Sequence, residues 1–109
     1  MKIDKETGKK IQELQILEQN IQNLLLQKQA FQIELNETTN ALEELKKSKD
    51  SAFKIVGQIM IKADKKELEK ELEDKKNILN LRVNSIEKQE KIFNDKTEKL
   101  REEITTKLK

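Results

Sequence analysis

Cysteine, histidine, proline, tryptophan and tyrosine are all absent from the 109 residues, and there are only two glycines and three phenylalanines. Without Cys or His the chain has no thiol nucleophile, no imidazole base and no usual zinc ligand set. Gly8 and Gly57 stand alone, so no glycine-rich loop is available to bind phosphate. These absences argue against an enzyme, and we expect no catalytic residue, no cofactor and no metal.

Long apolar runs and an excess of one charge are also lacking. The longest apolar runs are three residues, at 24–26 and 59–61, too short for a membrane-spanning helix, and residues 1–6 contain no signal-peptide core. The 23 basic and 21 acidic residues leave a net charge of +2 without a basic block. We therefore expect a soluble, cytoplasmic chain that binds neither membrane nor nucleic acid. The absence of cysteine fits a reducing compartment.

Charged residues make up 40% of the chain, and apolar side chains recur between them at alternating spacings of three and four residues. This spacing is typical of the seam of a coiled coil. A first helix is predicted over about 11–47, and eight of its ten seam positions are apolar. These positions are Leu14, Leu17, Ile21, Leu24, Lys28, Phe31, Leu35, Thr38, Leu42 and Leu45.

A second helix is predicted over about 65–109, with seven of ten seam positions apolar. Asp64 followed by Glu67 resembles a capping box, which places the start of this helix near Lys65. The seam positions are Leu72, Lys76, Leu79, Val83, Ile86, Glu90, Phe93, Thr97, Leu100 and Ile104.

Residues 52–63, between the helices, are rich in β-branched and aliphatic side chains and show no helical spacing. Gly57-Gln58 separates two apolar runs, as in a two-residue type II′ turn in which Gly supplies the positive φ. The alternative is a helix-to-helix linker with an incidental glycine. We predict one mainly α domain over residues 1–109, a long antiparallel coiled coil whose two helices are joined by a β-hairpin.

One polar pair is predicted in the seam. Folding the chain symmetrically about Gly57 places Lys28 and Glu90 in adjacent layers. A polar pair in a coiled-coil seam costs stability but fixes the register of the helices. We therefore expect Lys28 and Glu90 to set the register.

The hairpin is also a candidate assembly element. Two narrow helices cannot cover all of its apolar side chains, and a lone two-stranded hairpin is marginal in water with both edges open. Either the hairpin is tucked against its own helices, or other chains complete its sheet, and we favour obligate oligomerisation. The assembly residues are then Phe53, Ile55, Val56, Gly57, Ile59, Met60 and Ile61.

The first helix is poor in charge over residues 11–33, where only Glu13, Glu18 and Lys28 are charged and Gln and Asn are frequent. Aliphatic side chains also lie outside its seam, which indicates low-specificity contact with other chains, although single exposed leucines are ordinary. At the free ends of the helices, fraying would expose further aliphatic residues. These residues either bind unfolded polypeptide or form the ordinary end of a coiled coil. These candidate binding residues are Ile11, Leu14, Ile16, Leu17, Ile104 and Leu108.

The chain contains several short stretches whose order around the Gly-containing hairpin resembles that of the prefoldin β-type subunit in its archaeal form. The resemblance covers the chain from about Ile11 to Leu108. The clear departure from the family pattern is Phe53, where a Tyr is expected. The stretches are Gln27-Lys28-Gln29, Asn36-Glu37-Thr38, Ala41 to Leu45, Phe53 to Gly57, Ile59 to Lys62, Leu81-Arg82 and Glu87 to Glu90.

The resemblance implies a subunit of an ATP-independent holding chaperone, which binds non-native proteins and passes them to a group II chaperonin. It implies a hexamer of two α-type and four β-type subunits, in which the hairpins assemble into an intersubunit β-barrel. The coiled-coil tips would hold the client, which favours a binding role for Ile11, Leu14, Ile16 and Leu17.

Two rival functions remain open. A structural or multimerisation coiled coil without client binding would need neither a strand-like insert nor a charge-poor helix segment. An RNA-binding helical arm would need a basic stripe, whereas here the lysines of residues 87–99 alternate with acidic residues.

Overall fold

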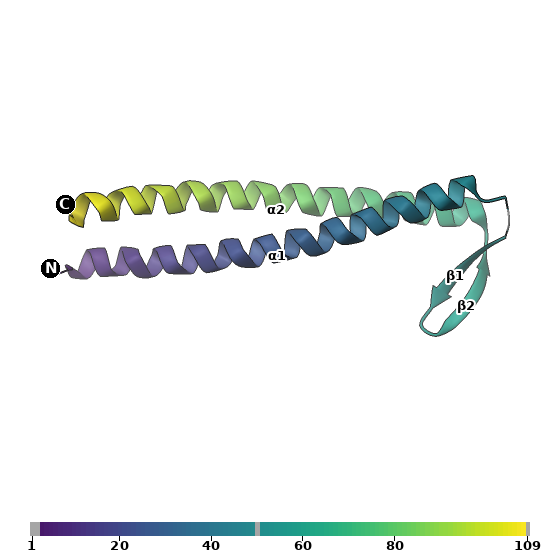
Figure 1. The fold of residues 1–109 in the computed structure, drawn as a ribbon, viewed down its shortest axis with the longest axis horizontal. Helices are drawn as coiled ribbons and strands as arrows, with labels where there is room; N and C mark the ends of the chain where they lie inside the picture. Colours follow the sequence, from purple (N-terminus) through teal and green to yellow (C-terminus); the bar gives the residue numbers. More distant parts are fainter. Residues whose placement is uncertain (1–2, 50, 109) are drawn as a thin grey trace. The chain divides into compact units, whose positions relative to one another are not determined.

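The computed structural model describes residues 3–49 and 51–108, and it contains two helices and one hairpin (Figure 1). The elements follow in the order α1 (Lys5–Lys47), β1 (Ala52–Val56), β2 (Ile59–Ala63) and α2 (Lys65–Leu108). The predicted fold class is confirmed. Residue 109, with which the second helix was expected to end, lies outside the described residues. None of the described helices is long and apolar enough to cross a membrane.

Helix α1 begins at Lys5, earlier than the predicted start near residue 11. Asp4 provides the cap, because its Oδ1 accepts a hydrogen bond of 2.7 Å from the Thr7 backbone N–H and its carbonyl accepts one of 3.0 Å from that of Gly8. Hydrogen bonding by the Thr7 side chain and backbone holds the pKa of the Asp4 carboxyl below its ordinary value of 3.8. A capping carboxylate thus extends the helix beyond the point where the apolar seam begins.

The hairpin has the predicted turn. Val56 pairs with Ile59, which leaves Gly57 and Gln58 as the two turn residues. Gly57 has a φ of +63°, and no non-glycine residue of the described chain has a positive φ. A positive φ at the first turn residue alone is the pattern of a type II′ turn. The helix-to-helix linker is therefore excluded.

Helix α2 begins at Lys65, as predicted, and Asp64 caps it. The Asp64 Oδ1 accepts a hydrogen bond of 2.9 Å from the Lys66 backbone N–H. The Lys65 Nζ also donates a hydrogen bond of 2.6 Å to the Ser48 carbonyl, just after the end of α1. This bond ties the beginning of the second helix to the end of the first.

Each helix contributes to two compact units. The terminal unit comprises the described residues of 1–29 and 84–109, and the hairpin unit those of 30–83. Each unit has its own buried side chains where its two helix segments pack together. Those of the terminal unit are Thr7, Leu24, Ile86, Thr97 and Ile104, and those of the hairpin unit are Thr38, Leu42, Leu45, Leu79 and Val83.

Candidate functional site

The apolar side chains of the hairpin are exposed on both of its faces. Directly paired residues share a face, so Ile55 and Met60 lie on one face, and Val56 and Ile59 lie on the other. The six predicted apolar assembly residues expose 46–69% of their surface. A hairpin tucked against its own helices would bury one of these faces, and the structure of the single chain shows no such burial.

One hairpin face is held toward α2. Lys54, which shares its face with Ile61, lies with its Nζ 3.5 Å from Glu71 Oε1 of α2. The opposite face carries Phe53, Ile55 and Met60. The apolar residues of both faces stay exposed, including Val56, Ile59 and Ile61 on the face of Lys54.

Lys28 and Glu90 meet in the terminal unit, where the Lys28 Nζ lies 2.9 Å from Glu90 Oε1. Their side chains are only 22% and 15% exposed, so the pair is largely enclosed at the seam. The hydrogen bond to Glu90 raises the pKa of Lys28 above its ordinary value of 10.5. The predicted contact is present, and its role in setting the register stays a prediction.

The predicted binding residues do not share one environment. Ile16 is exposed, and Ile11, Leu14, Leu17 and Leu108 are half-buried. Ile104 is only 8% exposed and belongs to the core of the terminal unit, so it is not accessible while the helices are paired, and its role in binding stays a prediction.

Two ion pairs lie between the free ends of the helices. Lys10 Nζ lies 3.3 Å from Glu103, the residue before Ile104, and Lys107 Nζ lies 3.9 Å from Asp4. Both pairs join α1 to α2 across the seam. Ile104, a seam position near these pairs, is buried among the apolar side chains of the paired helices.

Sequence reasoning missed three exposed aliphatic residues on α2. It considered the charge-poor part of the first helix, where Leu26 and Ile33 are indeed exposed. The same criterion, an aliphatic residue outside the seam, would have identified the others on the second helix. They are Ile78, Leu81 and Ile92.

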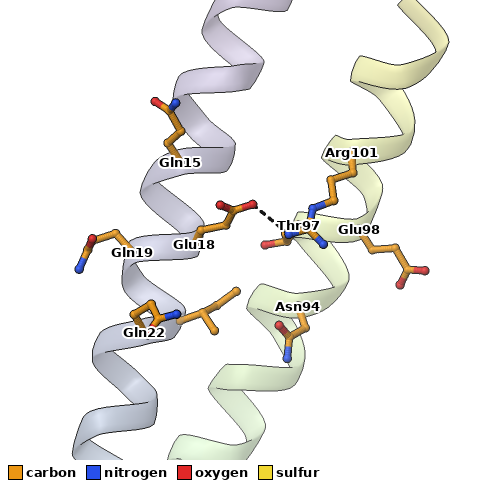
Figure 2. A pocket seen from close by; sticks show the side chains of 9 residues that line it. Gln15, Glu18, Gln19, Gln22, Asn94, Thr97, Glu98 and Arg101 are labelled. Carbon is orange, nitrogen blue, oxygen red and sulfur yellow. Dashed lines mark hydrogen bonds and ion pairs between the residues drawn. The ribbon is translucent and has the colours of Figure 1, made fainter.

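Sequence reasoning also missed a groove between α1 and α2 in the terminal unit, with a volume of about 760 Å³ (Figure 2). Its lining is mostly uncharged and polar, with Gln15, Gln19 and Gln22 from α1 and Asn94 and Thr97 from α2. The frequent Gln and Asn of residues 11–33 were the available signal, because several of them fall on one side of the helix.

The charged groups of the groove pair with each other. Arg101 Nη2 lies 2.9 Å from Glu18 Oε1, and this ion pair joins the two helices (Figure 2). In the part of the chain that the structure describes, no group of acidic side chains is placed to hold a metal ion.

Known proteins share both this fold and this sequence. A family model described as "Prefoldin subunit" matches residues 8–109. The prefoldin subunit beta of Thermococcus onnurineus is 37% identical over 99 residues, covering 89% of this chain and 85% of that protein. The prefoldin subunit beta of Saccharolobus islandicus is 37% identical over 105 residues, covering 94% and 83% respectively.

A solved structure agrees with these relatives. The crystal structure of the prefoldin beta subunit from Thermococcus strain KS-1 matches with a TM-score of 0.91 and 31% identity, covering 99% of this chain and 96% of that one. Prefoldins are chaperones that assemble from several subunits, which agrees with a hairpin whose apolar faces are uncovered in the single chain. The chain belongs to the prefoldin family and is a chaperone subunit of the β type.

Proposed function

We propose that this chain is one subunit of an ATP-independent holding chaperone that binds non-native proteins through its terminal unit. The whole chain, residues 1–109, acts as one prefoldin-like domain in the cytoplasm and has no catalytic activity. The observation that carries the proposal is that both units expose apolar side chains, although the chain is dominated by charge. Contiguous exposed apolar surface marks sites of contact with other chains.

The hairpin is the assembly element of this proposal. The uncovered pair of Ile55 and Met60, and the open strand edges, are completed by the hairpins of other subunits in a β-barrel. The assembly is a hexamer of two α-type and four β-type chains. The turn at Gly57 allows the two strands to follow each other directly.

Client binding belongs to the terminal unit. The residues we assign to it are Ile11, Leu14, Ile16, Leu17 and Leu108, with Ile104 contributing only where the helices separate. Each apolar contact contributes roughly 1–2 kcal/mol, and contacts from several subunits add because the assembly raises their effective concentration. Such binding is reversible, which suits transfer of the client to a group II chaperonin.

The decisive experiment measures assembly and holding together. The mass of the chain is determined by light scattering after size exclusion, alone and with an α-type subunit of the same source. The mixture is then tested, without ATP, for suppression of aggregation of an enzyme diluted from guanidinium chloride. We expect a complex of four copies with two partners that suppresses aggregation. If the chain forms a dimer that does not bind the α-type subunit and does not suppress aggregation of the enzyme, the result would instead favour a purely structural coiled coil.

A further inference from the structure

The exposed hairpin carries a side chain that mild oxidants attack. The sulfur atoms of cysteine and methionine are the side-chain atoms that peroxides oxidise most readily. The sequence has no Cys and two methionines, Met1 and Met60, and Met60 is the one that lies within the described residues. Oxidation of the described part of the chain by a mild peroxide is therefore concentrated at one position.

Met60 is accessible in the single chain. Its side chain in β2 is 67% exposed, and it lies directly opposite Ile55 of β1, which is also exposed. Phe53 precedes Ile55 by two residues, so it lies on the same face of the hairpin, and it is exposed as well. The susceptibility of a sulfur atom to oxidation follows its exposure. A small oxidant thus reaches the Met60 sulfur from solvent.

Hydrogen peroxide converts a thioether into a sulfoxide by transferring one oxygen atom. The Met60 Sδ donates an electron pair to one peroxide oxygen, so an S–O bond forms and the O–O bond breaks. The sulfur is oxidised by two electrons and the peroxide is reduced, and its second oxygen leaves as water with both protons. The change is reversible, because sulfoxide reductases restore the thioether and each acts on one sulfoxide epimer.

The sulfoxide changes the hairpin face but not the fold of the single chain. The strand pairing and the turn at Gly57 use backbone groups, and the new oxygen of an exposed Met60 stays in contact with water. When another chain covers this face, the oxygen loses its water among apolar neighbours such as Ile55 and Phe53. A polar group buried without a hydrogen bond opposes association.

We propose that Met60 is a modification site at which a peroxide controls the assembly of this chain. The sulfoxide form stays folded but associates poorly through its hairpin, and reduction of the sulfoxide restores association. In the complete assembly the face of Ile55 and Met60 is covered, so the modification acts on the free chain before it is incorporated. The inference rests on the proposed assembly role of the hairpin and adds a regulation to it.

The test compares the full-length chain before and after treatment with hydrogen peroxide, which is then removed with catalase. Trypsin cleaves after Lys54 and Lys62, so mass spectrometry of the peptide 55–62 measures oxidation of Met60 separately from that of Met1. Association with an untreated α-type subunit is followed by analytical ultracentrifugation over a range of concentrations. We expect the oxidised chain to need about tenfold higher concentrations to assemble, with unchanged circular dichroism.

Two further measurements test reversal and protection. Treatment of the oxidised chain with reductases for both sulfoxide epimers should restore assembly at the original concentrations. Peroxide added to the complete assembly should oxidise Met60 at least about tenfold more slowly than in the free chain, because susceptibility follows exposure. Neither measurement depends on a variant.

Two variants locate the effect. Met60→Leu lacks the thioether, so its own level of assembly should be the same with and without peroxide. The matched control is Met60→Leu with Ile92→Met, which moves the thioether to an exposed position of α2 outside the hairpin. This control should be oxidised as readily as the parent chain, and peroxide should leave its assembly unchanged.

Three results overturn the proposal. Unchanged assembly of a chain whose Met60 is fully oxidised would show that the interface tolerates the sulfoxide. An equal effect of peroxide on Met60→Leu would place the sensitive group at Met1. Oxidation of Met60 at the same rate in the assembly and in the free chain would show that assembly does not cover it. If the untreated parent chain does not associate at all, the proposed assembly function fails as well, whereas these three results leave that function intact.

Discussion

The two units are built from the same pair of helices, yet they differ in what they bury and what they expose. The hairpin unit has a core of four aliphatic side chains, among which Leu79 is fully buried, and it exposes apolar faces on a defined hairpin. The terminal unit contains the enclosed Lys28–Glu90 pair and the unpaired Thr97 hydroxyl, and its groove is lined by carboxamides.

This difference between the two exposed surfaces indicates how one fold can bind two kinds of partner. Strand edges and alternating side chains select a partner with a complementary strand, so the hairpin unit suits a fixed assembly. Uncharged polar groups and scattered aliphatic residues select very little, so the terminal unit suits clients of many sequences. Under the proposed function, assembly contacts and client contacts are thus assigned to different units of a single chain.

The largest effect is expected from changing the exposed hairpin face. Ile55→Thr with Met60→Thr keeps strand propensity but removes the apolar pair, and the assembly should fall to its single chains while the helical circular dichroism is retained. Light scattering and circular dichroism measure the two effects. Ile92→Thr, an exposed aliphatic residue on α2, is the control and should assemble normally. Intact assembly of the double variant would show that the hairpin is not the assembly element.

A smaller but clear effect is expected in the core of the hairpin unit. Leu79→Ala removes a fully buried side chain and should lower the free energy of unfolding by about 3 kcal/mol. Leu81→Ala, two residues later and exposed, should change it by less than about 0.5 kcal/mol. Urea titration followed by circular dichroism provides both values. Similar values at the two positions would contradict the proposed core.

The two glycines should respond in opposite directions to the same substitution. Gly8 lies within α1 and has space for a Cβ atom, so Gly8→Ala should stabilise the chain by about 0.5–1 kcal/mol. Gly57 also has space, but its φ of +63° strains any L side chain, so Gly57→Ala should destabilise the hairpin by about 1 kcal/mol. Thermal unfolding of each variant gives the sign, and stabilisation by Gly57→Ala would exclude the type II′ turn.

The Lys28–Glu90 pair should affect the register of α1 against α2 more than the free energy of unfolding. In the variant Lys28→Leu with Glu90→Leu, we expect alternative pairings of the two helices, visible as broadened distances between spin labels on residues 20 and 94. If the double variant keeps the parent's distance distribution and its assembly, Lys28 and Glu90 do not set the register. Because the pKa of Lys28 is raised, its contribution to stability is complete below pH 10.5 and is lost as the pH rises through the raised value.

The smallest effect concerns the start of α1. The pKa of Asp4 is lowered, so its contribution to stability is present above pH 3.8 and is lost as the pH falls through the lowered value. The protection of the first-turn amide protons, which is the exchange rate of an unfolded peptide at the same pH divided by their own, should decrease over that acidic range. Asp4→Asn keeps a capping side chain without the charge and should abolish this pH dependence.

Local signals explain the parts of the fold that the sequence predicted. The turn at Gly57 and the cap at Asp64 depend on short-range backbone preferences, and the apolar seam defines most of both helices. The start of α1 was predicted too late because the seam begins after the cap at Asp4, a polar signal that the apolar pattern does not contain.

The candidate site was less predictable because it depends on pairing between the helices. Composition showed that residues 11–33 are rich in carboxamides, but it did not show that Gln15 and Gln22 line a groove together with residues of α2. The exposure of Ile104 depends in the same way on pairing, since it is buried where the two helices pack together and becomes accessible only where they separate.

The beginning of α1 and the end of α2 lie side by side in the terminal unit, where Asp4 and Lys107 form an ion pair, and this position has a mechanical consequence (Figure 1). A force that pulls the ends apart acts across the helix axes, so the layers of the seam carry the load one after another rather than together. The helices then unzip from their ends, and the Lys28–Glu90 layer is reached only after those of Lys10–Glu103 and Glu18–Arg101. Pulling on these helix ends is therefore resisted by one layer of the terminal unit at a time, which requires a smaller force than breaking all of its layers together.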